Sequence, residues 1–330
     1  MSFALPLVLI PIVQLSLAGG AQPAWEPVAG YPGGRAVQHL TAAWRDDQLA
    51  LFAANDASGL LVSGDGGGAW GETNAGLPRT RLGGVRLVDL AVDPAHPQVM
   101  YTAVDSSPAS PRPMLYWSVD GGVHWQPRAS LGRERVQALA VDGVTGDLYI
   151  ATLADVRCAT ASTVATGASL SPQERYASGR DDLRYTILTS LQGQAPVTAF
   201  GLIEDTLYVG TRDGGLQLVL VDRTGRGVWP WETAEGLSEG LTLQTLCGLP
   251  GEPESILAGS SAGLYASADG GRTWFKAGEA VGERSVLSLC APAALPETVL
   301  AGTAGSGVWI SRDAGLTWSR YGVGLSGAEV

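Results

Sequence analysis

The sequence predicts an all-β fold, a single β-propeller of four-stranded antiparallel blades, with six blades favoured and seven left open. Three observations lead to this class. A short phrase that ends in tryptophan occurs four times, three strand-like segments precede it, and no stretch of the chain keeps a helical period. Repetition every few tens of residues is typical of folds whose units bury their faces only against their neighbours.

The repeated phrase has serine, then aspartate two residues later, glycine two residues after that, and tryptophan at its eighth position. An aspartate side chain in such a turn accepts hydrogen bonds from nearby backbone N–H groups, and glycine permits a positive φ. We therefore expect each copy to be a structural hairpin turn whose tryptophan begins the next strand. The residues with this expected role are Ser63, Asp65, Gly67, Trp70, Ser118, Asp120, Gly122, Trp125, Ser267, Asp269, Gly271, Trp274, Ser311, Asp313, Gly315 and Trp318.

Three short apolar runs precede each phrase, and turn residues bound them, as expected for strands. Examples of the second strand are 207–211, 256–260 and 299–303, and examples of the third strand are 263–267 and 307–311. With the strand after the tryptophan, each unit has four strands and no helix, as in a propeller blade. The inner strands are expected to begin near Val37, Val85, Val136, Val197, Leu241 and Val286.

The spacing of the tryptophans supports six units. Trp70 and Trp125 are 55 residues apart, and Trp274 and Trp318 are 44 apart, whereas 149 residues separate Trp125 from Trp274. Two degenerate copies of the phrase, 178–185 and 222–229, lie in that gap and account for two further units. A spare outer strand at 25–30 leaves a hidden seventh blade as the alternative.

Composition is that of one globular domain, expected over residues 22–330. The chain has 330 residues with 45 glycines and 19 prolines, which suits many tight turns. Its net charge of −11 argues against a nucleic-acid partner, because phosphate binding depends on Lys and Arg. A ring that closes once predicts a single domain with no linker.

The N-terminal segment, residues 1–21, is apolar and ends in small residues, as in a secretory signal peptide, although it has no Lys or Arg. It predicts an extracytoplasmic, secreted or periplasmic protein, with an uncleaved membrane anchor or a misassigned start as alternatives. Membrane association is expected only through this segment.

The chain has three cysteines and three histidines, too few and too scattered for a metal site, so neither a metal nor a cofactor is expected. Cys247 and Cys290 fall near the ends of neighbouring inner strands. They are expected to be packed thiols, and a disulfide between them is the alternative for an exported protein.

Arginines recur just before the inner strands: Arg35, Arg81, Arg133, Arg135 and Arg284. Circular repetition would bring them around one mouth of the propeller channel. In an acidic protein they would form a local basic surface for a carboxylate, a phosphate or an acidic segment of a protein partner.

A structural role for these arginines is the competing interpretation. Acids recur at or just past the ends of the second strands, at Asp56, Asp105, Asp155 and Asp213. Arginines and acids that interleave on one face would form an ion-pair network of little value per exposed pair. A long segment expected between the second and third strands of the third unit, 154–178, is either functional or simple decoration.

The phrase resembles the Asp-box, or BNR, repeat. Thr273-Trp274 and Thr317-Trp318 match its full pattern, whereas Ala69 and His124 replace the threonine in the first two copies. The resemblance implies a structural turn at the blade rim. Taken over the chain from Trp25, the pattern is similar to photosystem II assembly and stability factors and to exported bacterial BNR proteins, which implies a non-catalytic scaffold that binds a protein.

Sialidases also carry this repeat, but the early arginine here lies in Gly33-Gly-Arg35-Ala-Val37, with no Arg-Ile-Pro, so their catalytic residues do not carry over. Glycoside hydrolysis needs two carboxylates about 5–10 Å apart. Asp105 and Asp155 are the candidates for that alternative, a carbohydrate-active enzyme. We expect a non-catalytic binding or scaffold protein that uses the arginine-bearing loops, with no catalytic residues.

Overall fold

The structure is a computed structural model. It describes residues 39–45, 48–55, 59–65, 69–79, 85–104, 114–130, 135–159, 185–191, 196–212, 215–220, 232–292 and 295–321. Three predicted features lie outside these residues: the apolar segment 1–21, the expected strand at 25–30 and the degenerate copy of the phrase at 222–229.

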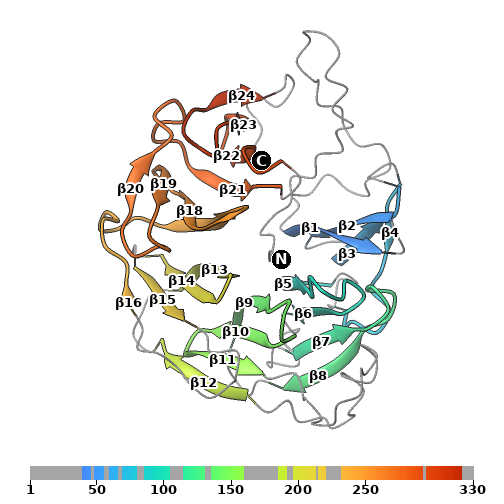
Figure 1. The fold of residues 1–330 in the computed structure, drawn as a ribbon. Helices are drawn as coiled ribbons and strands as arrows, with labels where there is room; N and C mark the ends of the chain where they lie inside the picture. The colour runs from blue at the N-terminus through green and yellow to red at the C-terminus, as the bar shows by residue number, and fades with distance from the viewer. Residues whose placement is uncertain are drawn as a thin grey trace. The chain divides into compact units, whose positions relative to one another are not determined.

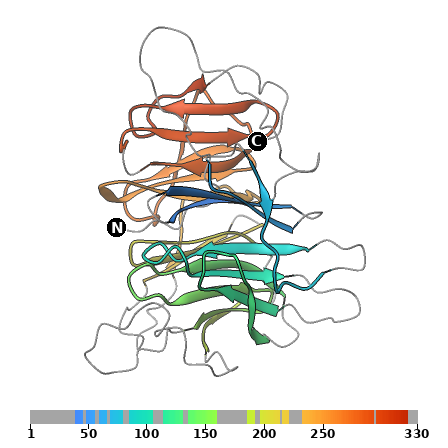
Figure 2. The same cartoon turned by 90° about the vertical axis from the view of Figure 1, so that its right-hand side faces the viewer.

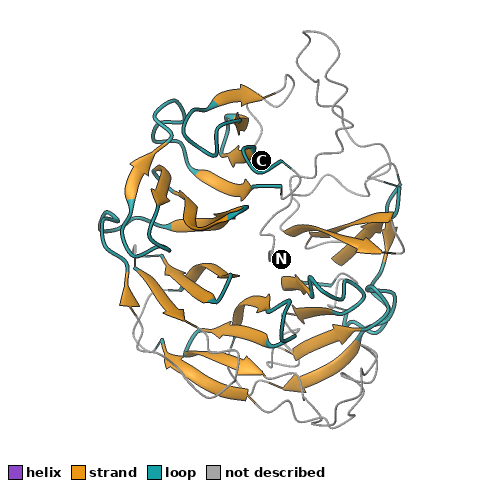
Figure 3. Cartoon of the chain, viewed as in Figure 1, coloured by secondary structure: helices purple, strands orange, loops and turns teal. Residues whose placement is uncertain are grey.

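The described residues form 24 strands in six four-stranded antiparallel sheets and contain no helix (Figures 1 and 3). In each sheet the strands are hydrogen-bonded in sequence order, so each sheet is one blade. Blade 1 is β1 (His39–Arg45), β2 (Gln48–Asn55), β3 (Gly59–Ser63) and β4 (Gly71–Glu72); blade 2 is β5 (Leu87–Val92), β6 (Met100–Val104), β7 (Met114–Ser118) and β8 (Gln126–Ser130); blade 3 is β9 (Val136–Val141), β10 (Leu148–Thr152), β11 (Asp155–Ala159) and β12 (Tyr185–Ser190).

The second half of the chain repeats this arrangement. Blade 4 is β13 (Val197–Ile203), β14 (Thr206–Thr211), β15 (Leu216–Leu220) and β16 (Glu232–Thr233); blade 5 is β17 (Leu243–Leu249), β18 (Glu252–Ser260), β19 (Gly263–Ser267) and β20 (Phe275–Ala277); blade 6 is β21 (Val286–Cys290), β22 (Val299–Thr303), β23 (Gly307–Ser311) and β24 (Ser319–Tyr321). The predicted fold class, an all-β propeller with six four-stranded blades, is confirmed.

The chain divides into two compact units. Unit 1 contains blades 1–3, whose strands lie within Ala29–Gln194. Unit 2 contains blades 4–6, whose strands lie within Ala195–Asp222 and Gly227–Val330. Each unit is described by itself below. A single domain over residues 22–330 stays a prediction.

The third strand of blade 3 corrects one expectation. Residues 154–178 were expected to separate the second and third strands of that blade. The structure instead forms β11 at Asp155–Ala159, only two residues after β10, and pairs it with β12. The long segment of blade 3 is therefore 160–184, between its third and fourth strands, and it lies outside the described residues.

The cores lie between the faces of neighbouring blades. In unit 2, Leu257 and Leu264 of blade 5 pack with Leu289 and Trp309 of blade 6, and the two blades lie side by side in Figures 1 and 2. Equivalent clusters join blades 4 and 5, blades 1 and 2, and blades 2 and 3. Apolar burial of this kind stabilises by about 25 cal/mol per Å².

Five of the six inner strands carry a β-bulge near their first residues. Each skips one residue in its pairing with the second strand. A bulge re-aims side chains and increases the local twist. The skipped residues are Val88, Gln137, Thr198, Gln244 and Leu287.

A hydroxyl closes the turn between the second and third strands in four blades. The last residue of the second strand donates its side-chain hydroxyl to a backbone carbonyl at or just before the start of the third. This local side-chain bond to the backbone stabilises a short turn between the two strands. The donors are Thr152, Thr211, Ser260 and Thr303.

Candidate functional site

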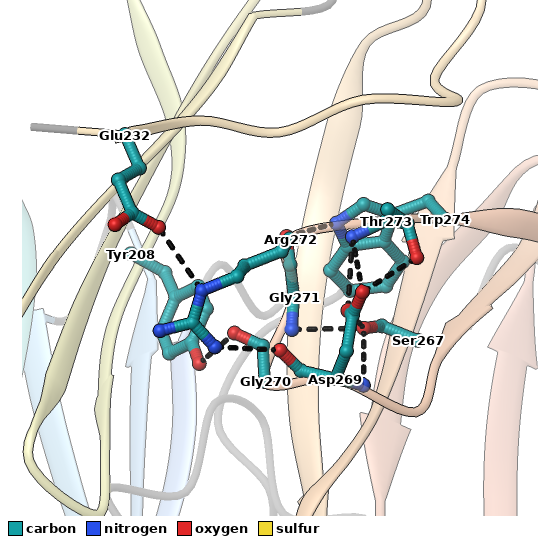
Figure 4. A network of polar contacts seen from close by, with 9 residues as sticks. All are labelled: Tyr208, Glu232, Ser267, Asp269, Gly270, Gly271, Arg272, Thr273 and Trp274. Carbon is teal, nitrogen blue, oxygen red and sulfur yellow. Dashed lines mark hydrogen bonds and ion pairs between the residues drawn. The ribbon is translucent and has the colours of Figure 1, made fainter.

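The turn between the third and fourth strands of blade 5 shows how the repeated phrase folds (Figure 4). Asp269 accepts hydrogen bonds from the backbone N–H of Thr273 at 2.9 Å, from its hydroxyl at 2.6 Å and from the Ser267 hydroxyl at 2.8 Å. Ser267 Oγ in turn accepts the backbone N–H of Gly271 at 2.8 Å. The side chains of Ser267 and Asp269 thus satisfy backbone and hydroxyl groups within the turn itself, as a tight turn requires.

The other three copies form the same turn wherever the structure describes them. Asp313 accepts the Thr317 N–H at 2.8 Å, Asp120 accepts the His124 N–H at 3.0 Å, and Asp65 accepts the Ala69 N–H at 2.9 Å. His124 replaces the missing threonine hydroxyl with Nδ1, which lies 2.8 Å from Asp120 Oδ2. Gly67 lies outside the described residues.

In the turns of blades 5 and 6, the glycine three residues before the tryptophan is required by two separate conditions. Gly271 has a φ of 85°, and a Cβ there would lie 2.7 Å from Tyr208 Cε1 of the preceding blade. Gly315 has a φ of 95°, and its Cβ would lie 2.9 Å from Leu257 Cδ1. The turn therefore packs directly on the second strand of the preceding blade, where only glycine fits. Ala314, one residue earlier, adopts a φ of 56° without being glycine.

The tryptophan of the turn faces the preceding blade as well. Trp274 is 4% exposed, packs with the cluster between blades 4 and 5, and donates its indole N–H to the Gly271 carbonyl at 2.7 Å. Its backbone N–H donates to the Glu235 carbonyl at 2.9 Å. Trp318 is similarly buried between blades 5 and 6.

A charged contact completes the junction of blades 4 and 5. Arg272 Nε lies 3.1 Å from Glu232 Oε2, and its guanidinium also donates to the Asp269 carbonyl at 3.0 Å. Tyr208 donates its hydroxyl to the Gly270 carbonyl at 2.8 Å, from blade 4 to blade 5 (Figure 4). These contacts serve the architecture, because every group in them is used within the two blades.

Hydrogen bonds from threonine lower the pKa of two turn aspartates. The Thr273 hydroxyl and then its N–H lower the pKa of Asp269 to about 2, and Thr317 does the same for Asp313, also to about 2. At Asp120, burial raises the pKa, but the bonds donated by His124 and Ser118 outweigh it, and the pKa is lowered.

We expect a loss of stability in acid from these two aspartates. Their pKa is lower folded than the value near 3.9 of an unfolded chain, so their contribution is present above about pH 4 and is lost as the pH falls towards about 2. A variant with Asp269→Asn and Asp313→Asn should show a flatter decline of the free energy of unfolding across that window in urea titrations. Glu279→Gln is the matched control, because the Glu279 side chain accepts no hydrogen bond among the described residues. A double variant with the wild-type pH profile would contradict the assignment.

Two glycines that sequence reasoning missed seat the turns on the preceding blade. Gly236 has a φ of 84°, and a Cβ on it would lie 2.1 Å from the Trp274 carbonyl oxygen; Gly76 has a φ of 93° and the same relation to Trp125. The repeated Gly-Leu pairs, Gly76-Leu77 and Gly236-Leu237, are the signal in the sequence that could have identified them.

The expected binding arginines are partly described. Arg135 lies in unit 1 and Arg284 in unit 2, and each is exposed just before an inner strand. Arg284 donates to the Val281 carbonyl at 2.6 Å and lies over the Trp309 ring at 5.4 Å. Arg35, Arg81 and Arg133 lie outside the described residues, so the shared channel mouth stays a prediction.

The loops that carry these arginines are tied to their neighbours by backbone bonds. Leu153 donates its N–H to the Arg135 carbonyl at 3.1 Å, and Ala304 donates to the Ser285 carbonyl at 2.9 Å. Arg212, exposed in the turn between the second and third strands of blade 4, accepts the Thr242 hydroxyl with its carbonyl at 2.8 Å. Unit 2 therefore presents arginine side chains from hydrogen-bonded loops.

The acids expected beside those arginines do not pair with them where the structure describes them. Asp155 is buried and forms two bonds to Arg157, Nε–Oδ1 at 2.7 Å and Nη2–Oδ2 at 3.0 Å. It also accepts the Thr152 hydroxyl at 2.8 Å. Both oxygens of this candidate catalytic acid thus hold a turn of blade 3. Asp56, Asp105 and Asp213 lie outside the described residues.

The cysteines are free thiols. Cys247 and Cys290 are buried in β17 and β21, and burial raises the pKa of Cys247 to about 12 and that of Cys290 to about 11. Thiols of this kind are poor nucleophiles. The described residues include no group of three or more His, Cys, Asp or Glu side chains that could hold a metal ion, and no helix long and apolar enough to cross a membrane.

Comparisons with known proteins find similar folds among solved structures but no match by sequence. No protein-family model and no curated protein sequence matches the chain. Among solved structures, YCF48 from Cyanidioschyzon merolae matches with a TM-score of 0.63 at 14% identity, over 93% of this chain and 91% of that one. A YCF48 structure described as bound to D1 peptide matches with 0.61 at 13%, over 92% and 87%.

A glycoside hydrolase has the same blade architecture. The GH74 xyloglucanase from Xanthomonas campestris matches with a TM-score of 0.52 at 18% identity, over 82% of this chain but 45% of the enzyme. At these identities the likeness shows the fold alone. The class that the fold defines is therefore a six-bladed propeller, similar in fold to a peptide-binding propeller and to half of a hydrolase.

Proposed function

We propose that this protein is a non-catalytic propeller scaffold that binds an acidic segment of a protein partner on its arginine-bearing loops. The observation that carries the proposal is the exposure of Arg135 and Arg284 on loops held by backbone bonds. Neither side chain forms an ion pair with an acid of the described residues. An exposed guanidinium on a fixed loop is well suited to a carboxylate.

The likeness in fold to YCF48, which has a structure described as bound to D1 peptide, supports a polypeptide as the ligand class. The four Ser-Asp-Gly-Trp turns support assignment to the Asp-box propellers as part of the same proposal. An extracytoplasmic location, through the segment 1–21, completes it. The engagement of Asp155 with Arg157 gives no support to glycoside hydrolysis.

A binding titration tests the proposal. The full chain is titrated with a fluorescent synthetic peptide rich in Asp and Glu that ends in a free carboxylate, with a Lys-rich peptide of the same length beside it. We expect selective binding of the acidic peptide. Arg135→Gln with Arg284→Gln should weaken it about tenfold or more, because a hydrogen bond to a charged group contributes about 1.5–3 kcal/mol.

Arg312→Gln is the matched control. It removes the same charge from an exposed arginine of blade 6, but from the turn after β23, at the opposite end of the blade from the loop before β21. Unchanged affinity in the double variant, or an equal loss in Arg312→Gln, would reject the arginine-bearing loops as the binding surface.

A further inference from the structure

Unit 2 exposes three large apolar side chains in its described part: Phe275, Leu295 and Leu316, which are 57%, 46% and 80% exposed. Leu295 lies in the loop between β21 and β22, and Leu316 lies in the turn between β23 and β24. In an antiparallel blade these two connections share one end of the sheet. They also touch, because Ala314 donates its N–H to the Glu297 carbonyl at 2.8 Å.

The strand register places Phe275 at the same rim. Phe275 pairs with Ala266 in the third strand of blade 5, and Glu232 pairs with Leu218 in the third strand of blade 4. Ala266 and Leu218 are equivalent, because each lies two residues after the third-strand residue that pairs with a glycine of the second strand. Phe275 and Glu232 therefore occupy equivalent positions in their blades. In the same way, Leu316 occupies the position in the blade 6 turn that Arg272 occupies in the blade 5 turn.

This equivalence identifies an apolar counterpart of a charged contact. Glu232 and Arg272 are 3.1 Å apart across the junction of blades 4 and 5. The junction of blades 5 and 6 has Phe275 and Leu316 in their places. The pair adds no polar contact to its junction, and both side chains remain largely exposed to solvent.

The charges around these residues are mostly negative. Among the described residues, the loops between first and second strands and the turns between third and fourth strands of unit 2 carry two arginines, Arg272, which pairs with Glu232, and Arg312, which lies over the Tyr321 ring. The acids at the same ends of these blades are Glu204, Asp205, Glu252, Glu254, Asp269, Glu297 and Asp313.

We propose that Phe275, Leu295 and Leu316, the apolar rim of blades 5 and 6, form a docking surface for a basic, amphipathic segment of a protein partner. Exposed apolar residues that gather at one place and are rimmed by charge mark interaction sites. The acidic surroundings select Lys or Arg beside the apolar contacts of the partner. This surface is at the opposite blade end from Arg284, so it is separate from the arginine-bearing loops.

The test measures a defined probe by fluorescence anisotropy. The full chain is titrated with a synthetic peptide of alternating Leu and Lys pairs, and with the same peptide carrying Glu in place of Lys. We expect binding of the basic peptide alone. Phe275→Ser with Leu316→Ser should weaken it about tenfold, as for residues at the centre of an interface, and Glu254→Gln with Glu297→Gln should weaken it in a salt-dependent manner.

Controls keep the result specific. Leu153→Ser removes a leucine that is 47% exposed in unit 1 and should leave the affinity unchanged, as should Arg284→Gln. Circular dichroism verifies the fold of each variant, whose changes are at exposed positions. Equal binding by Phe275→Ser with Leu316→Ser and wild type would overturn the proposal. So would a dimer that this variant dissociates in analytical ultracentrifugation, since the occupant would then be a second copy of the chain.

Discussion

Replacement of Trp274 by alanine is expected to lower the free energy of unfolding by about 3–5 kcal/mol, the usual cost of removing a large buried aromatic side chain. Trp274 is 4% exposed and lies in the cluster shared by blades 4 and 5, beside Tyr208 and Leu218. Its removal leaves a cavity between two blades and leaves the Gly271 carbonyl without its indole donor. Urea titration followed by fluorescence and circular dichroism measures the loss.

Trp274→Phe separates the packing from the hydrogen bond. Phenylalanine keeps an aromatic ring in the interface but removes the 2.7 Å bond to Gly271, so a loss of about 1 kcal/mol is expected. If Trp274→Ala were no more damaging than Trp274→Phe, the tryptophan would not hold the two blades together and the assigned role would be wrong.

Replacement of Gly236 by alanine should cost about 2–4 kcal/mol. The added Cβ would lie 2.1 Å from the Trp274 carbonyl oxygen, which is backbone and does not move aside without displacing the blade 5 turn. Overpacking of this kind costs about 1–3 kcal/mol. The φ of 84° adds about 1 kcal/mol or more for any residue with a Cβ.

Gly240→Ala is the matched control for backbone strain. Gly240 is in the same loop with a φ of 74°, but a Cβ there meets nothing within 4 Å. Its substitution should therefore show the cost of the positive φ alone, about 1 kcal/mol. Equal losses in the two variants would mean that the close approach to Trp274 contributes nothing.

Both predictions concern one structural device, the seating of each Ser-Asp-Gly-Trp turn on the blade before it. In unit 2 the loops at the two ends of the blades also carry different exposed side chains. One end carries arginines on hydrogen-bonded loops, and the other carries acids and the apolar rim of blades 5 and 6.

The sequence by itself determined the class of fold and the turns, and it favoured six blades over seven without deciding between them. The bonds from Thr273 and Ser267 to Asp269 join residues within eight positions, so the order of residue types along the chain was sufficient to predict them. The inner strands and the strands that lead into the turns were predicted for the same reason, because alternation and turn residues are local properties.

Only the tertiary structure decided which side chains meet across blades. Gly236 approaches Trp274, Glu232 pairs with Arg272 and Arg284 lies over Trp309, and each of these contacts joins residues of different strands or blades. The pairing of Asp155 with Arg157 also depended on where β11 begins, which the turn pattern placed too late in the chain. Local sequence specifies the turns within a blade, but contacts between blades depend on strand register and on the bulges that aim each side chain, and these are set only when neighbouring sheets pack.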